Sequence, residues 1–256
     1  MKSVELKKLN EDNYGYSESI KNLRTNVQFS GKNVKVIAFT SSLPGEGKSD
    51  VTYALAQSFT QMGKKVILVD ADIRKSVLVS RLEVHEEIKG LSEYLSGQCE
   101  REEILCRTNY PNLDFIFAGQ YSPNPAELLE EEMFGDLLKA LSQNYDYVFV
   151  DTPPVGAVTD CAIVSKHCDG IILVIESGAI SYKLLQKVKA QLEATGTRIL
   201  GAVLNKVDSN TEGYYGKYGK YGKYGKYGKY SKYDKYAKYG EYTKDGEGTG
   251  NGDLNG

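Results

Sequence analysis

Short apolar runs alternate with amphipathic stretches along most of the chain. The runs that predict strands are 33–40, 64–70, 113–119, 145–151, 170–176 and 198–205, and the stretches that predict helices are 50–63, 126–143 and 181–196. Most of the runs are apolar at consecutive rather than alternating positions, which is typical of strands buried on both faces. Buried strands that alternate with helices predict an α/β fold in which helices cover both faces of a mostly parallel sheet.

This pattern ends near residue 210, where a different composition begins. Every third residue from Tyr215 to Tyr242 is a tyrosine, glycine and lysine fill most of the other positions, and Val, Ile and Leu are absent. A period of three matches neither a helix nor a strand, and glycine disfavours a helix. Because no apolar burial offsets the cost of ordering, we expect residues 211–256 to be a flexible, disordered tail behind a domain at 33–210.

Charge is divided unequally between these two parts. The chain has a net charge of −2, but residues 214–244 hold nine lysines against Asp234 and Glu241. The tail is therefore basic and the rest of the chain acidic. A basic tail is compatible with binding to nucleic acid or to anionic lipid, and equally with attraction to the acidic domain of its own or a neighbouring copy. Four cysteines without disulfide or metal-ligand spacing indicate reduced thiols. No stretch resembles a signal peptide or a membrane span, which predicts a cytoplasmic protein.

A phosphate-binding motif follows the first predicted strand. The segment SSLPGEGKSD, residues 41–50, matches G-x-x-x-x-G-K-[ST] except at the first glycine, and a strand and a helix flank it as this motif requires. Backbone N–H groups of such a loop, with the positive end of the next helix, bind phosphate oxygens. The predicted nucleotide-binding residues of this segment are Ser42, Pro44, Gly45, Glu46, Gly47, Lys48, Ser49 and Asp50.

Carboxylates end two other predicted strands. VILVDAD carries Asp70 and Asp72, and YDYVFVD ends in Asp151. The carboxyl ends of parallel strands meet at one edge of a sheet, so we expect these side chains beside the phosphate loop. Such carboxylates supply Mg²⁺ ligands and an acceptor for a hydroxyl proton, and Lys48, expected to be solvated, reaches the outer phosphates. The motifs together predict nucleoside-triphosphate chemistry.

The segment NKVD, residues 205–208, follows the last predicted strand. This segment resembles the base-reading loop of many P-loop proteins, in which Asn205 would contact the nucleotide base. Asn-x-x-Asp is also common in turns, which is the alternative interpretation.

The combination of SLPGEGKS, VILVDADIRKS and YDYVFVDTPP with a C-terminal tyrosine cluster resembles the bacterial tyrosine kinases, in particular the cytoplasmic kinases of Gram-positive capsule and exopolysaccharide operons. The resemblance covers residues 15–242, including SPNPAELL at 122–129. It implies a P-loop NTPase-type fold and an ATP- and Mg²⁺-dependent protein-tyrosine autokinase. Ser49, Asp72 and Asp151 would hold Mg²⁺. Lys48 would neutralise charge on the triphosphate and Asp70 would accept or orient the tyrosyl proton, although Asp70 and Asp72 can exchange roles.

The resemblance also implies that the tail is the kinase's own substrate, presented to a neighbouring subunit. The tyrosine-containing stretch, residues 214–242, has 29 residues. If flexible, a stretch of that length has a root-mean-square end-to-end span of roughly 30 Å, enough to enter an adjacent active site. The expected phosphoacceptors are Tyr214, Tyr215, Tyr218, Tyr221, Tyr224, Tyr227, Tyr230, Tyr233, Tyr236, Tyr239 and Tyr242.

Assembly and partners follow from the same resemblance. The family's Glu-x-x-Arg-x-x-Arg motif corresponds to Glu18, Lys21 and Arg24, so residues 1–32 are expected to be an assembly segment of a homo-oligomeric ring. Lysine at the middle position cannot make a bidentate guanidinium contact, which weakens the expected interface. A membrane adaptor with a cytoplasmic activating tail would recruit the kinase to the inner face of the membrane, where it regulates capsule or exopolysaccharide synthesis and export. No nucleic-acid partner is expected.

The sequence departs from the family pattern at Asp50, and one alternative function stays open. Asp50 stands where the family usually has threonine and places a negative charge beside the phosphate loop. The rival is a partitioning-type P-loop ATPase switch whose basic tail binds an anionic polymer or a membrane. Those ATPases carry an additional lysine at the position of Leu43 and lack a tyrosine array, which argues against them.

Overall fold

The computed structural model describes residues 1–7 and 14–207. Its strands form one eight-stranded sheet in the order β1-β4-β5-β3-β6-β2-β7-β8. The strands are β1 (Lys2–Val4), β2 (Val36–Ser41), β3 (Val66–Asp70), β4 (Cys106–Thr108), β5 (Leu113–Ile116), β6 (Tyr147–Asp151), β7 (Gly170–Glu176) and β8 (Ile199–Asn205). Neighbouring strands are parallel except β4 and β5, which pair antiparallel. The predicted mostly parallel α/β fold is confirmed.

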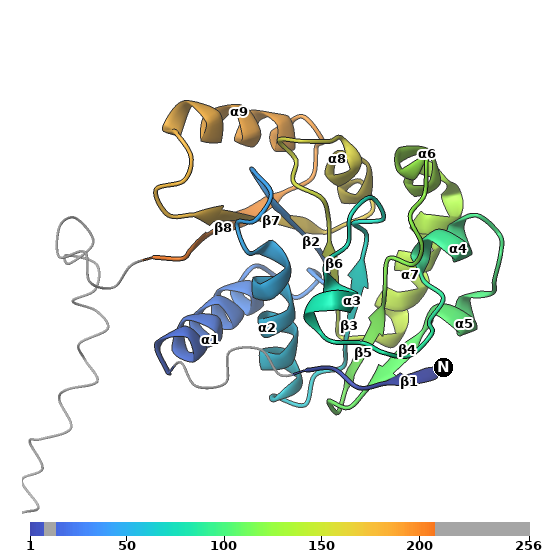
Figure 1. Cartoon of the computed structure of the whole chain (residues 1–256). Coiled ribbons are helices and arrows are strands. Elements are labelled where there is room, and N and C mark those ends of the chain that lie inside the picture. The colour runs from blue at the N-terminus through green and yellow to red at the C-terminus, as the bar shows by residue number, and fades with distance from the viewer. Residues whose placement is uncertain (8–13, 208–256) are drawn as a thin grey trace, which may run out of the picture. The chain divides into compact units, whose positions relative to one another are not determined.

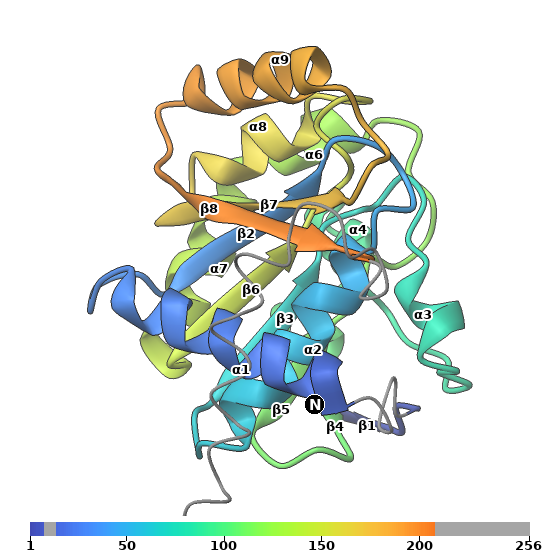
Figure 2. The same cartoon turned by 90° about the vertical axis from the view of Figure 1, so that its left-hand side faces the viewer.

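Helices cover both faces of this sheet (Figure 1). They are α1 (Tyr14–Phe29), α2 (Lys48–Thr60), α3 (Leu78–Arg81), α4 (Leu91–Leu95), α5 (Arg101–Ile104), α6 (Pro125–Glu130), α7 (Glu132–Asn144), α8 (Asp160–Ser165) and α9 (Tyr182–Glu193). Helices α1 and α2 pack on one face, and α4, α7, α8 and α9 contribute buried side chains to the other. Figure 2 shows β8, in orange, as an edge strand of the sheet.

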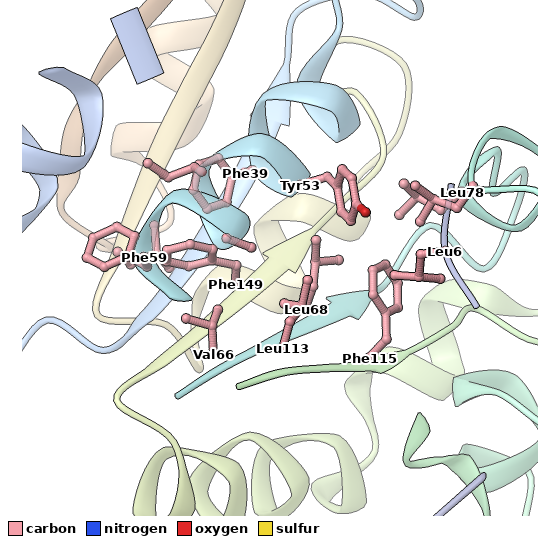
Figure 3. Packing of buried hydrophobic residues seen from close by; sticks show 14 of the residues in the cluster. Leu6, Phe39, Tyr53, Phe59, Val66, Leu68, Leu78, Leu113, Phe115 and Phe149 are labelled. Carbon is pink, nitrogen blue, oxygen red and sulfur yellow. The ribbon is translucent and has the colours of Figure 1, made fainter. Parts of the chain in front are cut away.

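The core on the α2 face is aromatic. Phe39 of β2 and Phe59 of α2 both pack edge-on against Phe149 of β6, with ring centroids 5.3 and 5.6 Å apart (Figure 3). Alternate residues of the central strands point to opposite faces, so Leu68 joins this cluster while Ile67 and Val69 join the other. Burial of the central strands on both faces explains their continuous apolar sequence and fixes where they end.

The boundaries of the predicted strands and helices agree with the structure to within a few residues, except that one predicted helix is divided into two. The single helix predicted over 126–143 is wrong, because α6 and α7 are separate helices. Glu131 between them adopts an extended conformation with ψ of 141°. The sequence patterns do not predict the antiparallel strand β4, the edge strand β1 or the short helices α3, α4, α5 and α8, since each is too short to show a period.

All four cysteines are free thiols, as expected. No helix of the described residues is long and apolar enough to cross a membrane. The predicted tail, with all its candidate phosphoacceptor tyrosines, lies outside the described residues from residue 208 onward.

Candidate active site

The loop between β2 and α2 has the conformation that a phosphate loop needs. Gly45 and Gly47 have φ values of 84° and 86°, which glycine adopts far more readily than other residues. At Gly47, a Cβ atom would also lie 2.2 Å from Nδ2 of Asn205. Glycine at 47 is therefore required both by the backbone conformation and by the close approach of β8.

The predicted carboxylates meet beside this loop. Asp70 and Asp151 are register partners at the ends of β3 and β6. Nζ of Lys48, at the start of α2, lies 3.2 Å from Oδ2 of Asp151 and 3.8 Å from Oδ2 of Asp72. The Ser49 hydroxyl donates to the same Asp151 oxygen at 2.5 Å. The structure thus brings together Lys48, Ser49, Asp70, Asp72 and Asp151.

Lys48 departs from expectation in one respect. The sequence predicts a solvated side chain, but the residue is only 9 % exposed. Burial by itself lowers the pKa of Lys48, but the carboxylates of Asp151, Asp72 and Asp70 outweigh it and raise that pKa above its usual value. The expectation of a solvated lysine is wrong because three strand-end carboxylates enclose the ammonium group.

The carboxylates differ in their surroundings. Asp70 is fully buried, and its burial, with the nearby charge of Asp151, raises its pKa to about 7. Burial also raises the pKa of Asp151, against the opposing effect of Lys48 and the Ser49 hydroxyl. Asp72 is 9 % exposed, and its Oδ1 accepts from the backbone N–H of Lys75 at 3.0 Å. Strongly shifted carboxylates next to an anion-binding loop are typical of functional sites.

Ser76 adds a hydroxyl group that the sequence did not single out. Its Oγ donates to Oδ2 of the buried Asp70, and the residue itself is partly exposed. This hydroxyl therefore lies between the enclosed carboxylate and the surface of the domain.

These residues fit a nucleotide triphosphate and a magnesium ion. The Ser42 hydroxyl is buried and has no hydrogen-bond partner among the described residues, which leaves it available to a ligand. Lys48 supplies a cation at the loop, and the Ser49 hydroxyl with one or two carboxylates is the donor set that Mg²⁺ takes together with phosphate oxygens. Within residues 1–7 and 14–207, no cluster of three or more His, Cys, Asp or Glu side chains is arranged to hold a metal by itself.

Asp50 is paired with a residue that sequence patterns did not reveal. Its Oδ2 lies 2.7 Å from Nη2 of Arg81 in α3, while its buried Oδ1 has no hydrogen-bond partner in the described part of the chain. Burial raises the pKa of Asp50, and the Arg81 charge opposes that shift. The ion pair explains how a carboxylate is accommodated next to Ser49.

A second arginine joins two loops of the site. Arg74, four residues beyond β3, donates from Nε and Nη2 to the two oxygens of Asp160 at 2.6 and 2.8 Å. Asp160 begins α8 and is fully buried. Bidentate pairing fixes the loop that carries Asp72 against the segment that follows Asp151. No local sequence pattern marks this pair, because its partners are far apart along the chain.

The remaining predicted residues lie around this cluster. Pro44 lies in the loop and Glu46 is 2 % exposed, with its Oε2 accepting from the N–H of Leu43 at 2.7 Å. Asn205 lies at the loop, where its Nδ2 donates to the Glu46 carbonyl at 2.9 Å. A contact of Asn205 with a nucleotide base stays a prediction.

The predicted assembly residues lie on α1, away from the strand-end carboxylates. Glu18 and Lys21 form an ion pair of 2.7 Å with both side chains near half exposed. Arg24 instead turns inward, and its Nη1 donates to the carbonyl and the hydroxyl of Ser58 in α2 at 2.8 and 3.0 Å. Their part in assembly stays a prediction.

A cavity of about 570 Å³ lies at the opposite end of the sheet. Its lining includes Lys35, Asp136, Lys139, His167 and Asp169 and none of the predicted site residues. Asp169 is already engaged, because its Oδ2 accepts from two backbone N–H groups at the start of β2. The convergence of shifted carboxylates at the phosphate loop, rather than cavity size, identifies the candidate active site.

Comparison with known proteins gives consistent relatives. Residues 34–201 match a family model described as an AAA domain. The chain is 44% identical over 199 residues to the tyrosine-protein kinase CpsD of Streptococcus agalactiae, covering 77% of this chain and 87% of that protein. It is 34% identical to the kinase domain of Escherichia coli tyrosine kinase ETK, with a TM-score of 0.73 and coverage of 77% and 78%. The septum site-determining protein MinD of Pyrococcus horikoshii, complexed with Mg-ADP, is less similar, with 25% identity, a TM-score of 0.57 and coverage of 66% and 69%.

Proposed function

The chain belongs to the tyrosine-protein kinases, and from that premise we propose that it transfers the γ-phosphoryl group of ATP to tyrosines within residues 214–242 of a neighbouring copy. The observation that carries the proposal is the enclosed group of Lys48, Ser49 and Asp151 at the phosphate loop. Phosphoryl transfer depends almost entirely on positioning and electrostatic stabilisation, which such a group supplies. The eleven tyrosines of residues 214–242, ten of them at every third position, provide acceptors in the same chain.

Each residue of the site has a proposed role. Lys48 and the loop N–H groups bind the outer phosphates, and Ser49, Asp72 and Asp151 hold Mg²⁺. When bound, the metal ion neutralises charge that develops on the transferring group. Before nucleotide binds, Asp151 accepts hydrogen bonds from both Lys48 and Ser49, so the ammonium and hydroxyl groups are already held at the end of β6.

Asp70 is the proposed proton acceptor. Its pKa of about 7 suits a group that takes a proton near neutral pH. Because Asp70 is fully buried, the tyrosyl proton would pass to Ser76 Oγ while the Ser76 proton passes to Asp70 Oδ2. This relay leaves the serine unchanged and the carboxyl group protonated.

Assembly, partners and biological role are part of the same proposal. A homo-oligomer built through Glu18, Lys21 and Arg24 would present each tail to the next subunit. A membrane adaptor with a cytoplasmic tail would activate the kinase at the inner face of the membrane. Each phosphate adds about −1.5 to −2 charges, so a few phosphates cancel the excess of lysine in the tail. Phosphorylation would thereby regulate capsule or exopolysaccharide synthesis.

The alternative function, a partitioning-type ATPase, requires a different residue in the phosphate loop. The partitioning ATPases carry a lysine at the position of Leu43, which reaches across a dimer. Leu43 is 38 % exposed and bears no charge. This observation favours the kinase.

Intact-mass measurement after incubation with ATP and Mg²⁺ tests the proposal. We expect several additions of phosphate to the full chain, and few to a variant with phenylalanine at all eleven tail tyrosines. Peptide mapping should exclude the exposed tyrosines of the domain, Tyr14, Tyr121 and Tyr182. ATP hydrolysis without protein phosphorylation would favour the ATPase, and equal labelling of both variants would show that the tail is not the substrate.

A further inference from the structure

Residues at the end of β8 form hydrogen bonds with backbone carbonyls of the phosphate loop. Nδ2 of Asn205 donates to the carbonyl of Glu46 at 2.9 Å. Nζ of Lys206, the next residue, donates to the carbonyl of Gly45 at 2.7 Å and to Oε2 of Glu176 at 2.7 Å. Glu176 ends β7, so two adjacent strands contribute to this contact. Figure 2 shows the orange strand β8 ending beside the start of α2.

Lys206 adopts an unusual backbone conformation to make these contacts. Its φ is 54°, in the left-handed region that residues other than glycine rarely occupy. Neither glycine nor asparagine stands at this position, although both tolerate that region better than lysine does. Strained backbone held by specific side-chain contacts is characteristic of functional sites.

The buried carboxylate of Glu46 also connects the phosphate loop to the neighbouring strand. Its Oε1 accepts from the backbone N–H of Glu176 at 3.2 Å, and its Oε2 accepts from the N–H of Leu43. The loop is therefore tied to the end of β7 through a side chain and to the end of β8 through two carbonyls. Glu46 and Asn205 both take part in this connection, and Gly47 leaves room for the asparagine amide.

The hydrogen bonds to the loop carbonyls also determine where the N–H groups of the loop point. In a trans peptide, the C=O of one residue and the N–H of the next point in opposite directions. Holding the carbonyls of Gly45 and Glu46 outward therefore turns the N–H groups of Glu46 and Gly47 inward. Neither N–H donates a hydrogen bond within residues 1–7 and 14–207. Two donors are thus oriented toward the place where phosphate binds.

We propose that Lys206, supported by Glu176, and Asn205 are positioning residues that orient the phosphate loop for nucleotide binding. They act through the Gly45–Glu46 and Glu46–Gly47 peptide groups. The inference rests on the proposed nucleotide binding but does not require kinase activity. It assigns one N–H of the Asn205 amide to the loop, and a contact of the rest of the amide with the nucleotide base stays a prediction. Loss of these contacts should weaken nucleotide binding and leave catalysis by the nucleotide-bound enzyme nearly unchanged.

Equilibrium binding of a fluorescent ADP analogue with Mg²⁺ tests this inference on the full-length chain. We expect Lys206→Met and Asn205→Ala each to raise the dissociation constant about tenfold, which corresponds to about 1.4 kcal/mol. Lys206→Arg, which keeps a donor, should recover most of the affinity. Lys187→Met removes a lysine of α9 that is exposed and should bind as wild type does.

Lys206→Gly separates positioning from general stability. Glycine relieves the left-handed conformation, so thermal stability should be unchanged or higher, while affinity for the ADP analogue falls as in Lys206→Met. Kinase assays should give a raised KM for ATP with kcat within about twofold of wild type, since an interaction that affects binding alone leaves kcat unchanged.

Three results would overturn the inference: wild-type affinity in Lys206→Gly, an equal loss in Lys187→Met, or a fall in kcat with no change in affinity. A wild-type chain that binds no nucleotide would overturn it together with the proposed function. Normal nucleotide binding without phosphotyrosine would contradict only the kinase proposal.

Discussion

At the residue scale, the enclosure of Lys48 determines what its replacement should do. Lys48→Met removes the cation that faces Asp151, Asp72 and Asp70. We expect loss of autophosphorylation together with a lower melting temperature, because breaking a buried ion pair costs about 3–5 kcal/mol unless the carboxylates take up protons. The loss should be larger at pH 8 than at pH 5, since protonated carboxyl groups need no cation.

Thermal denaturation of the nucleotide-free chain at both pH values measures this effect, with Lys187→Met as the control for an exposed lysine. Normal phosphotyrosine in Lys48→Met would contradict the proposed mechanism. Unchanged stability at pH 8 would contradict the enclosure of the lysine.

Asp70 should impose a pH dependence on folding. Its pKa of about 7 in the folded protein lies above the ordinary aspartate value of 3.8. The folded state therefore binds the proton more tightly than the unfolded state, and stability falls as pH rises from about 4 to 7. The expected loss is on the order of 2–4 kcal/mol, because one pKa unit corresponds to 1.36 kcal/mol.

Asp70→Asn should flatten that slope in denaturant unfolding of the Mg²⁺-free, nucleotide-free chain. Asp136→Asn, on the exposed side of α7, should keep the wild-type slope. If wild type and Asp70→Asn respond to pH identically, the buried carboxyl group does not titrate as described.

Asp50 should weaken nucleotide binding. Its carboxylate adjoins Ser49 and is only partly neutralised by Arg81, which is half exposed. Asp50→Asn removes a negative charge near the phosphate site, so ATP affinity should rise about three- to tenfold at low salt and less at high salt. Titration with a fluorescent nucleotide measures the change, and weaker binding by Asp50→Asn would show that the Asp50–Arg81 pair instead supports the site.

At the element scale, α1 connects the fold with the predicted assembly. Arg24 donates to the carbonyl of Ser58, in the last turn of α2, where helix carbonyls lack partners within the helix. A cation at this end also interacts favourably with the helix dipole. Arg24 thus stabilises the α1–α2 contact within one subunit, whereas the ion pair of Glu18 and Lys21 is exposed.

This difference predicts separate effects of two substitutions. Arg24→Ala should lower the free energy of unfolding by about 1–3 kcal/mol, as expected for a charge-assisted hydrogen bond to a buried group. Lys21→Ala should change it by less than about 0.5 kcal/mol and alter only the oligomeric state. Urea unfolding and light scattering measure the two quantities. Equal destabilisation by both would contradict the distinction.

Local sequence patterns predicted the elements that carry the chemistry. Strand ends and the phosphate loop are encoded in short contiguous segments, so Lys48, Asp70 and Asp151 could be assigned to one edge of the sheet. The break between α6 and α7 at Glu131 could not be predicted from the sequence, because the residues on either side of it have helical patterns. The Arg74–Asp160 pair and the contact of Lys206 with Gly45 join segments 86 and 161 residues apart, and only the folded chain reveals them.

At the scale of the whole molecule, the question is which subunit phosphorylates which tail. The chain contains both a phosphate loop and the tyrosine array, so sequence order alone allows transfer within one copy or between two. The predicted assembly residues on α1 favour transfer between copies, whereas the opposite charges of tail and domain attract the tail to its own domain as well as to a neighbour's. Exposed charges contribute about 1 kcal/mol or less per contact in water and are screened beyond ~10 Å at 0.1 M salt. Attraction between subunits must therefore come from many lysines together and should weaken at high salt.

Mixing two complementary chains tests transfer between copies. One is Lys48→Met with an intact tail, and the other is active but has phenylalanine at all eleven tail tyrosines. We expect phosphate on the inactive chain, at a rate that rises with concentration and falls with salt, because the substrate must first associate with a neighbour. A mixture of Lys48→Met with an inactive, phenylalanine-substituted chain is the control and should remain unlabelled. If the complementary mixture is also unlabelled while the wild-type chain labels itself at a concentration-independent rate, each kinase phosphorylates its own tail.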